Sequence, residues 1–239
     1  MKEHSLFESL LSIIYPSFCV VCGEKTENAY PLCEDCERKV REVQYPYCRV
    51  CGKPMPSLNI TVCGGCLTHP PPFAMARSGY IYDGVLKEVI HKWKYGGKRS
   101  LSRLMNSLLV KAILKSDIPI ASIDRIVYVP MSKEKLRRRG FNQTEDMARH
   151  LSKTFSIPLY IDLKKKSYIR EQALLSKEER LRNIKGAFYL SENLPDIKNI
   201  LVIDDVYTTG ATVREIAKTF VSAKRDINVY IFTLSRGVL

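Results

Sequence analysis

Cysteine is absent from the chain after residue 66, although all eight cysteines of the 239 residues lie before that point. The later residues therefore have neither disulfides nor thiolate metal sites to support them, and their fold must depend on a hydrophobic core. A hydrophobic fraction of 45% makes such a core feasible and excludes a disordered chain. The cysteine-free length also excludes a disulfide-stabilised mini-protein.

Long apolar runs are missing as well. The most apolar N-terminal stretch, residues 6–15, is interrupted by Glu8 and falls short of the roughly 20 residues that span a bilayer. It also has no basic start followed by a small-residue cleavage site. Leu6, Leu10 and Ile13 recur at helical spacing, so we expect an amphipathic helix that packs on the protein. With no targeting segment, we expect no membrane insertion and a cytoplasmic location.

Positive charge is scarce in the N-terminal part of the chain and abundant in the rest. The formal net charge is +13. Residues 1–72 carry seven Lys and Arg and eight Asp and Glu, whereas residues 73–239 carry 31 Lys and Arg and 17 Asp and Glu. The excess gathers in three runs, at residues 87–103, 133–139 and 163–185. Such runs indicate an acidic ligand, either a phosphorylated small molecule or a nucleic acid. For residues 87–103 a solvated charged face is an equally good interpretation.

The cysteines form four Cys-x-x-Cys pairs at regular intervals, a pattern typical of zinc ribbons. The pairs are Cys19/Cys22, Cys33/Cys36, Cys48/Cys51 and Cys63/Cys66. A glycine follows the first pair of each half, and its positive φ lets backbone N–H groups face the sulfurs. A redox dithiol would be a single pair beside a βαβ unit, and disulfides conflict with a reducing cytoplasm. We therefore expect two structural Zn²⁺ ions, each bound by four sequential thiolates that leave no position for a catalytic water.

A stiff His69-Pro70-Pro71-Pro72 junction follows the cysteines, and we place a domain boundary there. Residues 1–72 would form an N-terminal helix and a double zinc ribbon, and residues 73–239 a second domain.

Strand-like and helix-like segments alternate in the second domain. Strands are expected at residues 79–82, 126–129, 198–204 and 227–234, and helices at residues 86–93, 101–114, 142–155 and 211–223. Trp93 is at a core position of its helix, and Asn142 with Glu145 is expected to form a capping box. The alternation predicts an α/β fold, a parallel sheet with helices on both faces. Ligands of such sheets bind beyond the carboxyl ends of the strands.

The segment from residue 200 to 212 carries the strongest functional pattern. An apolar strand runs into Asp204 and Asp205, and then into a Thr-Thr-Gly-Ala-Thr turn that begins a helix. The turn offers backbone N–H groups, hydroxyls and the positive end of a helix dipole, all of which suit a phosphate. Two adjacent carboxylates suit the paired donors of a vicinal diol. Phosphate next to diol indicates a ribose 5-phosphate, and the Walker A and Gly-x-Gly-x-x-Gly motifs are absent.

This segment resembles the binding signature of type I phosphoribosyltransferases for 5-phosphoribosyl-1-pyrophosphate (PRPP). The whole chain resembles the ComF family of competence proteins (ComFC-like), in which a phosphoribosyltransferase-like domain follows a double zinc ribbon. The other segments that carry the resemblance are Val129-Pro130-Met131-Ser132, Arg138-Arg139-Gly140-Phe141-Asn142-Gln143, and Gln172, Arg180, Asn183 and Ala187-Phe188.

The resemblance implies a role for each segment. Asp204 and Asp205 would be the catalytic carboxylates that hold the ribose hydroxyls, and Mg²⁺ would bind together with PRPP. The PRPP site would also include Val206, Tyr207, Thr208, Thr209, Gly210, Ala211 and Thr212 around the 5-phosphate, Pro130, Met131 and Ser132 at the pyrophosphate, and Arg138 and Arg139 nearby. A mobile loop from about residue 165 to 186 would close over the site with Arg170, Gln172, Arg180 and Asn183.

Two functions remain open at this point. The first is a phosphoribosyltransferase or a PRPP-regulated relative, in which pyrophosphate departs through an oxocarbenium-like ribosyl centre that an acceptor attacks. The second is a non-catalytic module that binds single-stranded DNA, with a sensory or vestigial PRPP pocket. The resemblance implies a role in DNA uptake during natural transformation, beside a helicase of the ComF operon. The residues contain no base-reading motif, so their charge supports only sequence-independent contact with nucleic-acid phosphates.

Overall fold

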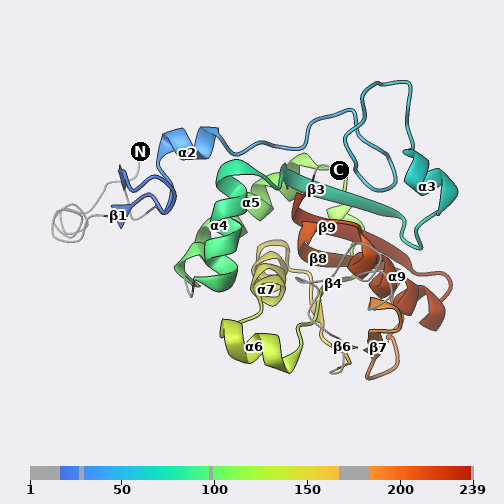
Figure 1. Cartoon of the computed structure of the whole chain (residues 1–239). Coiled ribbons are helices and arrows are strands. Elements are labelled where there is room, and N and C mark those ends of the chain that lie inside the picture. The colour runs from blue at the N-terminus through green and yellow to red at the C-terminus, as the bar shows by residue number, and fades with distance from the viewer. Residues whose placement is uncertain (1–16, 27–29, 97–98, 167–183, 238–239) are drawn as a thin grey trace.

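A computed structural model describes residues 17–26, 30–96, 99–166 and 184–237, arranged as shown in Figure 1. The helix expected at residues 6–15 lies outside these ranges, as do the expected loop residues Arg170, Gln172, Arg180 and Asn183. Among the helices within them, none has the length and apolar character that a bilayer crossing requires.

A five-stranded sheet forms the centre of the C-terminal part of the chain, and all its neighbouring strands are parallel (Figure 1). Its strands are, in spatial order, β3 (Met75–Ile81), β9 (Asn228–Arg236), β8 (Asn199–Tyr207), β4 (Arg125–Tyr128) and β5 (Leu159–Tyr160). Because side chains alternate along a strand, β8 supplies Leu201 and Ile203 to one face and Ile200 and Val202 to the other. Both faces of the sheet are therefore apolar and need a covering layer.

Helices cover both faces, as the sequence predicted. In Figure 1 α4 (Gly84–Tyr95), α5 (Ser102–Lys115) and α7 (Gln143–Phe155) lie to the left of the sheet, and α9 (Ala211–Ala223) lies to the right. An antiparallel hairpin of β6 (Leu163–Lys165) and β7 (Phe188–Leu190) packs beside α9. The α/β fold with a parallel sheet is thus confirmed.

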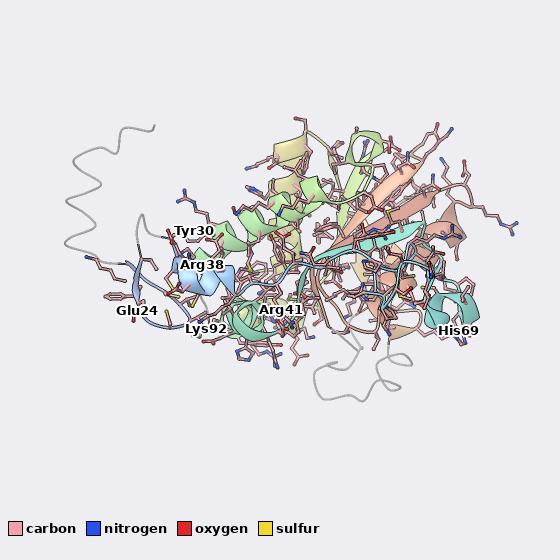
Figure 2. The ribbon with its side chains drawn as sticks, turned by 90° about the horizontal axis from the view of Figure 1, so that it is seen from above. Glu24, Tyr30, Arg38, Arg41, His69 and Lys92 are labelled. Carbon is pink, nitrogen blue, oxygen red and sulfur yellow. The ribbon has the colours of Figure 1, made fainter. Side chains whose placement is uncertain are left out.

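The N-terminal part consists of short elements around the cysteines. They are β1 (Ser17–Phe18), β2 (Lys25–Thr26), α2 (Glu34–Arg38) and α3 (Gly64–Thr68). Figure 2 shows Glu24 and Arg38, near the first four cysteines, at one end of the molecule and His69, which follows the last four, at the other. The segment between them runs along the outer edge of β3. There the Val43 N–H donates to the Gly79 carbonyl at 2.9 Å, and the Ala76 N–H donates to the Val50 carbonyl at 2.8 Å.

The expected elements of the second domain are present, with shifted ends. β3 begins at Met75 instead of residue 79, and β8 continues past the predicted end to Tyr207. The sequence did not predict the short strands β5, β6 and β7 or the helix α6 (Lys133–Arg139). The short 3-10 turns η1 (Arg99–Leu101) and η2 (Ile120–Ser122) were not predicted either.

Trp93 and the start of α7 test two local predictions. Trp93 has an exposed fraction of 0%, and its indole N–H donates to Ser102 Oγ at 3.1 Å, so its core position is confirmed. Asn142 caps α7 by accepting from the Thr144 N–H at 3.2 Å. The reciprocal half of the capping box does not form, because the Glu145 carboxylate pairs with Arg149 at 2.7 Å.

Candidate functional site

The eight cysteines gather into the two groups that sequential pairing predicts. The first tetrad is Cys19, Cys22, Cys33 and Cys36, and the second tetrad is Cys48, Cys51, Cys63 and Cys66. Within each tetrad the sulfurs lie within 4.8 Å of one another, which suits tetrahedral zinc. All four cysteines of the second tetrad are buried, whereas Cys22 of the first is exposed.

Backbone geometry favours the thiolate form of one cysteine in each tetrad. Gly23 and Gly52 have φ values of 80° and 69°, which turn backbone N–H groups toward the thiols as expected. Burial by itself raises the pKa of the Cys19 thiol, but hydrogen bonds from backbone amides outweigh it and lower the pKa to about 6. The same balance lowers the pKa of Cys48 to about 7. Thiolates are the ligands that structural zinc needs.

We expect about two zinc ions per chain in protein purified without oxygen, because each tetrad supplies four converging thiols. Cys22→Ser and Cys51→Ser should each lower the zinc content to about one ion per chain. The second substitution should also lower the melting temperature more, since Cys51 belongs to a buried core cluster. Elemental analysis measures the zinc content. A metal content near zero in wild-type protein would contradict the zinc ribbons.

The acidic pair, Asp204 and Asp205, lies at the C-terminal end of β8 beside a lysine from α4. The Asp205 N–H donates to Asp204 Oδ1 at 2.9 Å. Lys94 Nζ lies 2.7 Å from Asp205 Oδ2, and the two side chains are only 15% and 14% exposed. Shielding from water strengthens such an ion pair and makes it costly to leave either partner alone. Asp205 therefore has a fixed cationic partner when no ligand is bound.

A second lysine, from β6, acts on the other carboxyl group of the pair. Burial raises the pKa of Asp204 to about 7, and the negative charge of Asp205 adds to the rise. Burial lowers the pKa of Lys165 to about 8, which the positive charge of Lys135 reinforces and the Asp204 carboxylate opposes. The effects of these charges place Lys94 and Lys165 near the two carboxyl groups and Lys135 near Lys165. The site can therefore accept further negative charge.

The phosphate turn, residues 208–212, connects β8 to α9. Thr209 Oγ1 accepts from the Ala211 N–H at 3.3 Å, and Gly210 has a φ of 74° at the N-cap of α9. A side chain at Gly210 would collide with the ring of Tyr207, so only glycine fits. A hollow of about 20 Å³ opens at this turn, room for a single water-sized group. Among the predicted site residues, its lining includes Asp204, Val206, Tyr207, Thr208, Gly210, Ala211 and Thr212.

The predicted pyrophosphate residues follow the neighbouring strand. The Val129 N–H donates to the Ile203 carbonyl at 3.3 Å, which puts Pro130, Met131 and Ser132 next to the strand end that carries the acidic pair. Ser132 caps α6 by accepting from the Lys135 N–H at 3.3 Å. Its hydroxyl keeps a proton that it can donate to a ligand.

The two predicted arginines differ in placement. Arg138 is exposed on α6. Arg139 is half-buried, and its guanidinium stacks on the Tyr95 ring at 4.8 Å and donates to the Tyr95 hydroxyl at 3.0 Å. Arg139 is thus held against α4.

Sequence reasoning missed Lys94 and Lys165. Leu86, Ile90 and Lys94 stand at i, i+4 and i+8 of α4, and the first two are buried. A lysine on an apolar stripe is seldom buried unless it has a partner. The position of Lys94 could therefore have predicted that it pairs with an acidic group. No comparable pattern marks Lys165.

Comparisons with known proteins extend over most of the chain. The family model "Double zinc ribbon domain" matches residues 10–67, and the model "PRTase-CE" matches residues 84–236. "DNA utilization protein YhgH" of Escherichia coli is 30% identical over 215 residues, which cover 87% of this chain and 86% of the relative. "Competence protein F" of Haemophilus influenzae is 31% identical over 193 residues, covering 78% and 82%. Among solved structures, Helicobacter pylori xanthine-guanine-hypoxanthine phosphoribosyltransferase has a TM-score of 0.34 at 16% identity and covers 56% of this chain and 72% of its own.

Proposed function

Because the chain belongs to the ComF family, with a double zinc ribbon followed by a PRTase-CE domain, we propose that it binds PRPP, or a related ribose 5-phosphate, at the end of β8. One observation carries the proposal. The acidic pair and the phosphate turn are consecutive in the chain, and Lys94 and Lys165 face the pair. These groups match the three parts of PRPP. The carboxylates suit the ribose diol, the helix N-terminus suits the 5-phosphate, and the nearby cations suit the pyrophosphate.

Each group has a defined task in this proposal. The carboxylates of Asp204 and Asp205 accept hydrogen bonds from the ribose hydroxyls, and the amides and hydroxyls of residues 208–212 donate to the 5-phosphate. Lys165 of β6 and Lys135 of α6 balance the charge of the pyrophosphate. The carboxylate oxygens also suit Mg²⁺, which coordinates oxygen ligands and, when bound, would neutralise the pyrophosphate as it leaves. The arrangement supports phosphoribosyl transfer, and we place this activity in DNA utilization and competence, which are the words in the names of the two relatives.

Calorimetry with the full-length protein tests the proposal. Mg²⁺ and PRPP added together should release heat that fits one site per chain, and Mg²⁺ alone should not. Ribose 5-phosphate should bind more weakly than PRPP, since it has no pyrophosphate that Lys135 and Lys165 could bind. Wild-type protein that retains its zinc and gives no heat with Mg²⁺ and PRPP would refute the pocket.

Single-stranded DNA binding is a second candidate function, favoured by arginines stacked on aromatic rings beside the site. Arg139 lies over Tyr95, which is 52% exposed, at 4.8 Å. Arg99 lies over the buried ring of Phe141 at 5.6 Å and adds a cation beside it. Cationic and aromatic side chains in alternation are typical of surfaces that bind single strands without sequence preference.

We expect the affinity for single-stranded DNA to fall steeply with salt, since each neutralised phosphate releases a counterion. Replacing Arg137, Arg138 and Arg139 by glutamine should weaken binding and make the negative slope of log K against log salt shallower by about 2. Fluorescence anisotropy at several salt concentrations measures both effects. A matched variant, Lys218→Gln/Arg225→Gln, removes exposed charge near α9 and should leave the slope nearly unchanged. Absent or salt-independent binding would contradict this second function.

A further inference from the structure

Arg236 joins the second tetrad to the ligand side of the sheet. It lies at the end of β9 and is only 4% exposed. One guanidinium nitrogen, Nη1, donates to the Cys51 carbonyl at 2.8 Å. The guanidinium carbon lies 5.0 Å from the centre of the Tyr207 ring, within the range of a cation–π contact. Arg236 therefore touches a zinc-ribbon residue on one side and a residue at the root of the phosphate turn on the other.

Tyr207 in turn supports the phosphate turn. It is 6% exposed, and its carbonyl accepts from the Gly237 N–H at 3.0 Å. Its ring lies against Gly210, so close that a Cβ on Gly210 would come within 2.6 Å of Tyr207 Cζ. The ring position thus limits the conformation of the residue that caps α9.

The cysteine side of the connection is equally close-packed. A Cβ on Gly52, the residue after Cys51, would lie 2.7 Å from the Ala76 carbonyl oxygen and 3.4 Å from Arg236 Nη1. The four cysteines of the second tetrad share a buried cluster with Tyr207 and with Ala211 of α9. The first tetrad reaches the domain differently, through the Val20 carbonyl, which accepts from the 34%-exposed Lys92 at 2.5 Å. Figure 2 shows Lys92 near that end of the molecule.

We propose that Arg236 is a positioning residue that couples metal binding by the second tetrad to the shape of the phosphate turn. The Cys51 carbonyl fixes Arg236 by a hydrogen bond, and Arg236 contacts the Tyr207 ring by a cation–π interaction. The ring in turn packs against Gly210. A buried guanidinium that loses its carbonyl acceptor is left with an unsatisfied charged donor, which is costly, so a change at Cys51 displaces it. Coupling between two sites is reciprocal, and a ligand that needs the intact turn must in turn stabilise the metal in the second tetrad. This inference rests on the proposed function, because it takes residues 208–212 as the phosphate site.

Zinc release to a chelator tests the coupling in the full-length protein. A chromogenic zinc indicator should show two release phases of equal amplitude, one for each tetrad. Saturating Mg²⁺ and PRPP should slow one phase about tenfold and leave the other unchanged, which is within the usual range of coupling between sites. Arg236→Gln should abolish the slowing, and Arg236→Lys, which keeps the charge, should restore part of it. Lys92→Gln, a matched change at the contact with the first tetrad, should keep the full effect.

The outcomes separate the coupling from the proposed function. Calorimetry that detects PRPP binding, together with release phases that do not respond to PRPP, would overturn the coupling and leave the function intact. Absence of PRPP binding in zinc-loaded wild-type protein would remove both. Should Arg236→Gln fail to fold, Tyr207→Leu interrupts the same path from the other side and must also abolish the slowing. Retention of the slowing in that variant would overturn the proposal.

Discussion

Asp205→Asn is expected to weaken PRPP binding about a hundredfold. The substitution removes a charged acceptor for the ribose hydroxyls, and hydrogen bonds to charged groups contribute about 1.5–3 kcal/mol each. Loss of two such bonds corresponds to about 3 kcal/mol, or two factors of ten in the dissociation constant. Calorimetry with Mg²⁺ and PRPP measures the change.

The same substitution also affects stability, and a second variant separates the two effects. In Asp205→Asn, Lys94 remains mostly buried without its carboxylate partner, and breaking one half of a buried pair costs about 3–5 kcal/mol. Lys94→Met/Asp205→Asn removes both charges and should recover most of the lost melting temperature without recovering PRPP binding. Asp196→Asn, which changes a 96%-exposed carboxylate paired with Lys224, is the matched control and should alter neither quantity. Wild-type affinity in Asp205→Asn would show that the acidic pair does not contact the ligand.

Trp93→Ala should destabilise the protein about as much as breaking the buried ion pair. The side chain is fully buried, lies 6.1 Å from the ring of Phe141 and donates a hydrogen bond to Ser102. Truncating a buried tryptophan to alanine costs about 3–5 kcal/mol through lost burial and the cavity that remains. For a chain of this size, that loss lowers the melting temperature by about 10 °C.

A control on the same helix shows whether burial is the cause. Tyr95→Ala removes a half-exposed ring two residues further along α4 and should cost less than about 1 kcal/mol. Thermal melts followed by circular dichroism compare the two variants, and the more conservative Trp93→Phe keeps most of the volume. An unchanged melting temperature in Trp93→Ala would contradict the core position.

The features that could be read from the sequence are those in which neighbouring residues act together. The four Cys-x-x-Cys pairs and the consecutive acidic pair and phosphate turn are local patterns, and the structure assembles each of them as a unit. The longer strands and helices of the C-terminal part were predictable for the same reason, since their apolar periodicity is a local property. Their ends were less so, because hydrogen bonds to neighbouring strands extend β3 and β8. The short elements α6, β5, β6 and β7 were not predicted.

The features that could not be read depend on contacts between distant segments. Lys94 meets Asp205 only because α4 packs over the end of β8, and Arg236 meets Cys51 only because the N-terminal part lies along β3. Asn142 shows the limit on a smaller scale. Its side-chain cap was predictable from residue type. Sequence spacing did not show that Glu145 would pair with Arg149 instead of completing the capping box.

The segment along the outer edge of β3 has a consequence for the behaviour of the protein in concentrated solution. An uncovered edge strand is a template for strand pairing with another molecule and hence for aggregation. Residues 41–50 occupy hydrogen-bonding groups of β3 from Gly79 to Ile81 and at Ala76, and the opposite edge strand, β5, is only two residues long. Both borders of the sheet are thereby protected against intermolecular pairing. A shortened protein that begins at β3 would expose one of these edges. Residues 41–50 therefore help to keep the C-terminal part soluble, in addition to connecting the two zinc ribbons.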